Sequence, residues 1–240
     1  MHYFTFFMLA LACEILGTVA GFGSSVFFIP AAQFFYNIKL VLAITSLFHI
    51  FSNTTKIIVF YKSLNVHLIL LYGLPSLLFT ILGAYLTIWV IDTYLDIVLG
   101  TFLFVFSILL LLNPDYKLPA TYTNAIASGS VAGFMAGFLG TGGAIRGLSL
   151  TAFQLEANCY IGTSAAIDFG VDLSRFIIYY TSGFWDQEFI PFIPLLLIAS
   201  VAGTYIGKLI VGRYKQQTFR RIVLVVIGFT GFYMLLSYLI

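Results

Sequence analysis

Residues 136–149 read AGFLGTGGAIRGLS, a dense run of glycines with one arginine, Arg146, in an otherwise apolar stretch. A second glycine-rich run, GFGSS, occupies residues 21–25. Glycine costs about 1 kcal/mol relative to alanine inside a helix, so clusters of glycine and serine unwind it. The sequence therefore predicts a helix broken at each of these two places.

The surrounding sequence has the composition of a membrane protein. Of its 240 residues, 61% are hydrophobic and 8% are charged, whereas a soluble domain carries about 25% charge. The mean hydropathy is +1.05, and the net charge of +2 gives no basic surface for nucleic acid. We expect a multi-pass protein of the cytoplasmic membrane, with lipids and a small solute as partners. A homodimer is compatible with this composition.

One offset of 119 positions relates the two halves of the chain. The uncommon residues that stay in register are, in pairs, Gly21 and Gly140, Gly23 and Gly142, Lys56 and Arg175, Tyr61 and Tyr180, Ser63 and Ser182, and Pro75 and Pro194. Chance aligns apolar residues easily but uncommon residues rarely. The sequence predicts a first transmembrane repeat at 1–112, a linker at 113–121 and a second repeat at 122–240.

Each half contains four apolar segments, so we predict an all-α fold of about eight hydrophobic segments. They run from about 3–36, 40–61, 67–91 and 95–112, and from about 123–155, 158–181, 189–211 and 219–240. The first segment of each half would be roughly 50 Å long as a helix at about 1.5 Å per residue. A bilayer core is about 30 Å thick, and unwound backbone inside it must be buried or line a cavity.

The basic residues of the joints bear on topology through the positive-inside rule. If each broken segment turns back, every lysine and arginine of the joints except Lys39 falls on one side; the others are Lys62, Lys117, Arg213, Lys215, Arg220 and Arg221. If each segment crosses once, Lys62 and Lys117 lie opposite the rest. The first arrangement has the clearer bias and makes the halves inverted repeats, as in many secondary transporters. Both arrangements place the C-terminus outside.

A loop leading into a helix presents backbone N–H groups at the positive end of the helix dipole, which suits an anion. Two such loops would converge near the bilayer midplane, and Arg146 would add its charge there. Alternatively, Arg146 pairs with Glu14 or an aspartate, or extends to the headgroups. The glycines have an alternative role as well, because small residues four apart let helices approach closely.

A stripe of polar residues follows each broken segment. The first is Thr45, His49, Asn53 and Lys56, and the second is Ser164, Asp168, Asp172 and Arg175. The spacings of four, four and three place each stripe on one helical face. Lys56 and Arg175 would flank a polar path for anions, unless these charges only pair with one another. Protons would exchange at one of four acidic or imidazole groups, which the spacing does not distinguish: Glu14, His49, Asp168 and Asp172.

The glycine runs and their surroundings resemble the TauE/SafE sulfite exporter family, also grouped as sulfonate uptake permeases. The twin glycine elements of the family resemble GTVAGFGSSVFFIPA at 17–31 and AGFLGTGGAIRGLS at 136–149. The short segments of a small residue, threonine and serine that follow these elements resemble AITS at 43–46 and IGTS at 161–164. Ser24 and Ser25 stand where the family usually has glycine, and Ser149 stands where it usually has proline.

The resemblance implies a transporter that moves sulfite, an organosulfonate or thiosulfate, with export as the family habit. It carries a substrate site over to Gly21, Gly23, Ser24, Ser25, Thr45, Ser46, Gly140, Gly142, Gly143, Ala144, Thr163 and Ser164. To these the residue patterns add Thr141, Arg146, Asn53, Lys56 and Arg175.

Two other functions stay open at this point. One is a passive anion channel, and the other is a membrane-embedded sulfur-handling enzyme or carrier that uses Cys13 or Cys159. No common catalytic motif occurs in its required context, so enzymatic chemistry has little support. No cofactor or metal is expected, because neither cysteine has the spacing of a metal site.

Overall fold

The computed structural model of the protein describes residues 3–20, 23–113, 118–210 and 216–237. Over these residues it is all-helical, as predicted. The α-helices are α1 (Tyr3–Ala20), α2 (Ser25–Ala32), α3 (Ile38–Phe60), α4 (Val66–Trp89), α5 (Asp92–Leu112), α6 (Tyr122–Leu139), α7 (Gly143–Leu150), α8 (Ala157–Thr181), α9 (Ile193–Ile210) and α10 (Gln216–Leu236). Three short 3₁₀ segments are η1 (Tyr61–Ser63), η2 (Thr151–Phe153) and η3 (Gln187–Phe192).

Within the described residues, all eight predicted segments are helical, and the first of each half is broken at its glycine run, as predicted. Residues 21–24 separate α1 from α2, and residues 140–142 separate α6 from α7. Gly140 ends α6 in the left-handed region at φ 75°, and Gly23 adopts φ 82° before α2. Glycine reaches these conformations without the steric cost that a Cβ imposes. Gly21, and residues 114–117 of the predicted linker, lie outside the described residues.

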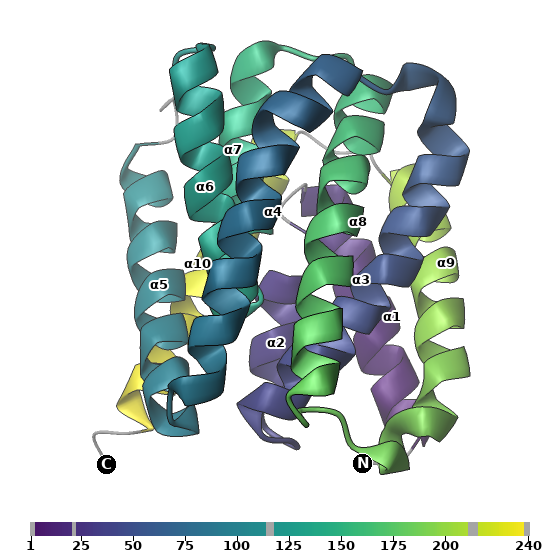
Figure 1. The fold of residues 1–240 in the computed structure, drawn as a ribbon, viewed down its shortest axis with the longest axis vertical. Helices are drawn as coiled ribbons and strands as arrows, with labels where there is room; N and C mark the ends of the chain where they lie inside the picture. Colours follow the sequence, from purple (N-terminus) through teal and green to yellow (C-terminus); the bar gives the residue numbers. More distant parts are fainter. Residues whose placement is uncertain (1–2, 21–22, 114–117, 211–215, 238–240) are drawn as a thin grey trace.

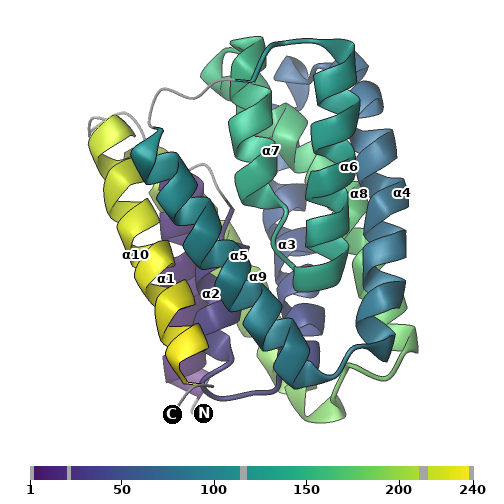
Figure 2. The ribbon, with the colours of Figure 1, turned by 90° about the vertical axis from the view of Figure 1, so that its left-hand side faces the viewer.

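Each broken segment turns back beside the helix that precedes it. Ser24, which precedes α2, donates a 2.7 Å hydrogen bond to Glu14 in the middle of α1. A Cβ on Gly142 would lie 2.9 Å from the Cβ of Ala136 in α6. Figure 2 shows α7 antiparallel to α6. The arrangement with a single crossing is therefore wrong for these segments, because it would carry α2 and α7 away from α1 and α6.

Four helix pairs build the bundle around the two hairpins: α4 with α6, α1 with α9, α3 with α8, and α5 with α10. α3 and α8 are antiparallel, because Asn53 and Asp172 meet midway along them while the amide of Asn65, beyond α3, reaches Thr163 near the start of α8. α4 and α6 run parallel. Figures 1 and 2 show α5 and α10 side by side at one edge.

Small residues allow α4 and α6 to approach closely. The Thr80 hydroxyl donates to the carbonyl of Gly133 at 3.0 Å, and a Cβ on Gly133 would lie 2.6 Å from the Cα of Ser76. On the other hairpin, a Cβ on Gly17 would lie 2.5 Å from the Cα of Ser24. Close packing, the alternative role that small residues can have in this sequence, thus occurs at Gly17 and Gly133.

The outer surface of the bundle is apolar, as a lipid-facing surface requires. Leu70, Leu74, Leu78 and Leu82 form one face of α4, and each is more than half exposed. Among the described residues, five helical stretches are long and apolar enough to span a membrane: Tyr3–Ala20, Ile38–Ser63, Val66–Trp89, Asp92–Leu112 and Gln187–Ile210. The start of α1 and the end of α10 lie at the same end of the molecule (Figure 1).

Candidate functional site

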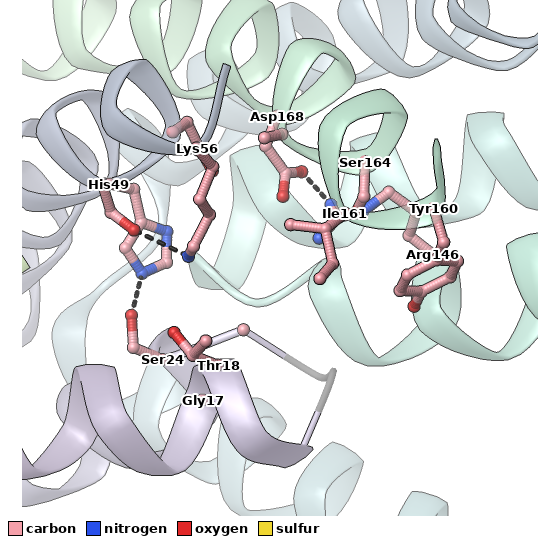
Figure 3. A pocket seen from close by; sticks show the side chains of 14 residues that line it. Gly17, Thr18, Ser24, His49, Lys56, Arg146, Tyr160, Ile161, Ser164 and Asp168 are labelled. Atoms are coloured by element: carbon pink, nitrogen blue, oxygen red, sulfur yellow. Dashed lines mark hydrogen bonds and ion pairs between the residues drawn. The ribbon is translucent and has the colours of Figure 1, made fainter. Parts of the chain in front are cut away.

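A polar region lies inside the bundle, between α3, α8 and the tips of the two hairpins. It consists of a larger cavity of about 70 Å³ and a smaller cavity of about 20 Å³. Both are lined by Gly23, His49, Arg146 and Asp168. A water molecule needs roughly 10–15 Å³ of such space, so the larger cavity has room for several waters. Figure 3 shows the side chains of one of these cavities.

Three cationic side chains reach these cavities from different helices. Lys56 comes from α3, Arg146 from α7 and Arg175 from α8, and their side chains are 16%, 8% and 1% exposed. Burial of an unpaired charge in a low-dielectric interior is strongly unfavourable. Each cation accordingly contacts one carboxylate.

Lys56 pairs with Glu14, the fully buried carboxylate of α1. The Lys56 Nζ lies 2.8 Å from Glu14 Oε1 and donates to the Ser52 hydroxyl at 2.7 Å. Ser52 and Thr204 donate to the same Oε1, and Ser24 donates to Oε2 at 2.7 Å. Five hydroxyl and ammonium donors surround this carboxylate; the fifth is Thr18. Such saturation compensates the loss of hydration that burial imposes.

Arg146 pairs with Asp168, which lies on α8. One guanidinium nitrogen, Nη1, contacts Asp168 Oδ1, and Nε donates to the Ser164 hydroxyl at 2.8 Å. Of the alternatives for Arg146, the pairing with an aspartate is correct; pairing with Glu14 and extension to the headgroups are wrong. The arginine faces the cavity because α7 turns back and places it opposite α8.

Arg175 pairs with Asp172 on its own helix, three residues away. Nε and Nη2 donate to Asp172 Oδ1 at 2.8 and 2.7 Å. Asn53 donates to the second oxygen, Oδ2, at 2.8 Å. The remaining nitrogen, Arg175 Nη1, is buried and has no hydrogen-bond acceptor among the described residues. It lies 3.1 Å from where a Cβ on Gly140 would be.

His49 connects these groups across the cavity. Its Nε2 lies 2.9 Å from the Ser24 hydroxyl, and its Nδ1 lies 3.7 Å from Asp172 Oδ2. Because Ser24 also contacts Glu14, polar groups run continuously from α1 to α8 through the first hairpin. Figure 3 shows His49 and Ser24 in contact on one side of the cavity, with Arg146 and Asp168 on the other.

The hairpin tips contribute backbone as well as side chains. Gly23, Ser24 and Ser25 line the cavities where α2 begins, and Gly140, Gly142 and Gly143 line the smaller cavity where α7 begins. The first N–H groups of a helix have no partner within it. Two positive helix ends therefore approach the same region from opposite hairpins.

Most of the predicted site residues line one or both cavities. These are Gly23, Ser24, Ser25, His49, Asn53, Lys56, Gly140, Gly142, Gly143, Arg146, Ser164, Asp168, Asp172 and Arg175. Glu14 lies behind Ser24, in contact with it.

Besides Glu14, five predicted residues of the described chain do not line either cavity: Thr45, Ser46, Thr141, Ala144 and Thr163. The Thr45 and Ser46 hydroxyls donate to carbonyls of their own helix, those of Val41 and Ala43. Thr163 accepts a hydrogen bond from the backbone of Asn65. Three of these four hydroxyl groups thus form hydrogen bonds outside the cavities. The fourth, that of Thr141, is fully buried and has no hydrogen-bond partner among the described residues.

Sequence reasoning missed four polar residues of the site: Thr18, Ser52, Tyr160 and Thr204. Thr18 and Ser52 lie four residues from Glu14 and Lys56 respectively, so an i,i+4 search around each buried charge would have found them. Tyr160 lies one turn before Ser164 and lines the larger cavity. Thr204 reaches Glu14 from α9, and no sequence spacing indicates that contact.

The comparisons with known proteins identify one family. The family model described as Sulfite exporter TauE/SafE matches residues 6–234, nearly the whole chain. No curated protein and no solved structure matches.

Proposed function

The chain belongs to the TauE/SafE sulfite exporter family of membrane transporters, and we propose that it moves sulfite or a related small sulfur oxyanion by alternating access around the two central cavities. The observation that carries this proposal is the convergence of Lys56, Arg146 and Arg175, from both halves of the chain, on one buried polar region. Cationic groups and helix N-termini are the elements that bind oxyanions in proteins.

The two halves act in this proposal as inverted repeats. α6 begins 119 residues after α1, and α8 begins 119 residues after α3. A two-fold axis that exchanges the halves would pair α3 with α8 and α5 with α10, and it would turn the contact of α1 with α9 into that of α6 with α4. These are the four main pairings of the bundle. Rocking of such repeats about a central site is a common basis for alternating access.

The charge distribution supports one orientation. Lys208 lies 4.9 Å from the ring of Phe60, so the ends of α3 and α9, with nearby Lys62, meet on one side of the bundle. Lys39 and Asp92 form an ion pair at 3.3 Å on the opposite side. The positive-inside rule places the first side in the cytoplasm. The start of α1 and the C-terminus are then outside, and the larger cavity lies toward the cytoplasm.

A transporter explains the site better than a passive channel. A channel needs a continuous path, whereas the Arg146–Asp168 ion pair lies where the two cavities meet. An enzyme or carrier based on cysteine conflicts with the transport role of the family, and neither Cys13 nor Cys159 lines a cavity.

The experiment is sulfite flux into proteoliposomes that contain the purified protein. We expect saturable flux, competition by thiosulfate or organosulfonates, and loss of flux in Arg146→Gln, because that change removes the cation between the cavities. Replacement of both cysteines by serine is the matched control and should leave flux intact. Flux that rises linearly with sulfite concentration would indicate a channel, and absence of flux from the wild-type protein would refute the proposal.

A further inference from the structure

The two cavities lie in series along α8. The larger cavity is lined by α8 residues from Tyr160 to Asp168, and the smaller by α8 residues from Asp168 to Arg175. Asp168 is the α8 side chain common to both. Any solute that passes from one cavity to the other must therefore pass Asp168 and its partner Arg146.

The three carboxylates of the site differ in whether both of their oxygens accept hydrogen bonds. Both oxygens of Glu14 accept hydrogen bonds, from Ser24 on Oε2 and from four donors on Oε1. Both oxygens of Asp172 also accept, from Arg175 on Oδ1 and from Asn53 on Oδ2. A proton on either carboxyl group would therefore bind to an oxygen that already accepts a hydrogen bond, and would weaken that bond. These two carboxylates are suited to remain ionised and to hold the cations with which they pair.

Asp168 is different in geometry. It contacts Arg146 through Oδ1, while its Oδ2 receives no hydrogen bond from the described residues. Its side chain is 17% exposed, against 0% for Glu14 and 4% for Asp172. Figure 3 shows the second oxygen directed into the cavity. A proton can therefore reach Asp168 without breaking any hydrogen bond other than that to Arg146.

The balance of positive and negative charges in the site favours binding of a proton when an anion enters. Lys56, Arg146 and Arg175 balance Glu14, Asp168 and Asp172, so the site is neutral when His49 is neutral. A monovalent anion that enters this region adds a net negative charge where water screens it little, which is unfavourable. One proton on a carboxylate restores neutrality.

We propose that Asp168 binds the co-transported proton, and that its protonation releases the Arg146 guanidinium to bind the anion. The inference rests on the proposed transport function. The proton adds to Asp168 Oδ2 as the anion replaces Oδ1 at Arg146, and both leave together on the other side of the membrane. A second negative charge beside Asp168 favours its protonated form, and by reciprocity the proton favours anion binding.

The groups that face Asp168 are compatible with this role. α3 presents His49 and Lys56, α7 presents Arg146, and the next turns of α8 present Asp172 and Arg175. Tyr160, near the start of α8, lines the larger cavity together with Asp168, whereas Tyr72 of α4 lines neither cavity and accepts a hydrogen bond from Ser149 of α7 at 3.1 Å. α6 contributes Ala136 and Gly140 to the cavity lining, without an ionisable group. Asp168 is the one of these carboxylates that lines both cavities.

The test compares sulfite uptake by the wild type and by Asp168→Asn in proteoliposomes with an imposed pH gradient. With one proton per anion, a gradient of one pH unit drives about tenfold accumulation in the wild type. Asparagine has the shape of the protonated acid but cannot release a proton. We expect the variant to accumulate no sulfite above equilibrium, and its exchange of labelled for unlabelled sulfite to show only the pH dependence that the titration of sulfite itself produces. Sulfite itself also titrates, but equally for both proteins.

The matched control is Asp92→Asn, which removes a carboxylate outside the cavities and should accumulate sulfite as the wild type does. Accumulation by Asp168→Asn at the wild-type level overturns the inference and leaves the proposed function standing. Absence of sulfite flux from the wild type overturns the proposed function instead. If Asp168→Asn does not fold, Asp168→Glu decides: the longer acid must shift the pH midpoint of exchange, and an unshifted midpoint overturns the inference.

Discussion

Asn53 of α3 donates a 2.8 Å hydrogen bond to Asp172 of α8, and the two residues are separated by 119 positions, the offset that is predicted to relate the two halves. Equivalent positions of the proposed repeats thus meet at the centre of the bundle, both almost fully buried. Two aspartates there would repel, because like charges at this distance cannot both be ionised. The amide in one half and the carboxylate in the other make the contact favourable.

Asn53→Asp should therefore destabilise the protein at neutral and alkaline pH and destabilise it less in acid. The reason is that one of the two facing carboxyl groups must be protonated. Asn53→Ala removes the same hydrogen bond without adding charge and should cost about 1.5–3 kcal/mol at any of these pH values. Thermal unfolding in detergent at several pH values distinguishes the two variants, and an identical pH response in both would contradict this account.

Much of the fold could be predicted from the sequence, because its strongest signals are local. The glycine runs indicate the two breaks, because the low helix propensity of glycine is a property of the run itself and needs no knowledge of the partner helices. The direction taken after each break was favoured only by the distribution of basic residues in the joints, and not by the segments themselves. α2 reads SVFFIPAA, which is apolar on all sides, so periodicity does not indicate which neighbour it packs against.

The candidate site could also be predicted in part, because the spacing of polar residues along one helix is a local signal. The stripes on α3 and α8 place Asn53, Lys56 and Arg175 on inward faces by spacing alone. The ion pair between Arg146 and Asp168 depends on the hairpin folding back, and the contact of Thr204 with Glu14 depends on the packing of α9 against α1. Such contacts between distant segments have no signature in the spacing of one sequence.

The buried pair of Lys56 and Glu14 predicts an asymmetric response to mutation. Lys56→Met leaves the Glu14 carboxylate buried without its cation and should cost about 3–5 kcal/mol. The double variant Glu14→Gln with Lys56→Met should recover most of that loss, because no unpaired charge remains. Lys39→Met is the control, since Lys39 pairs with Asp92 near the surface and should cost less than about 1 kcal/mol. A double variant as unstable as Lys56→Met would refute the pairing argument.

The close approach of α4 and α6 makes Gly133 sensitive to a single methyl group. In Gly133→Ala the new Cβ would lie 2.6 Å from the Cα of Ser76, so the helices must separate at a cost of about 1–3 kcal/mol. Gly73→Ala meets only the Ile167 side chain, at an ordinary contact distance of 3.5 Å, and should be neutral or slightly stabilising, because alanine is the better helix former. Thermal unfolding of the two variants measures the difference, and equal stability would show that the interface tolerates expansion.

Substitution of Arg175 by lysine tests whether the smaller cavity takes part in anion binding. Its Nε and Nη2 hold Asp172, while Nη1 has no acceptor among the described residues and lies beside Gly140, where α6 ends. In Arg175→Lys the ammonium can keep the ion pair with Asp172, but as a compact point charge it cannot also direct a planar donor toward Gly140. Loss of one charge-assisted hydrogen bond, about 1.5–3 kcal/mol, should weaken sulfite binding by roughly tenfold to a hundredfold, while the folded protein stays extractable.

Calorimetric titration of the purified protein with sulfite measures the affinity, and Lys62→Arg, a change outside both cavities, is the control. Wild-type affinity in Arg175→Lys would exclude Nη1 as a ligand of the anion and confine binding to the larger cavity.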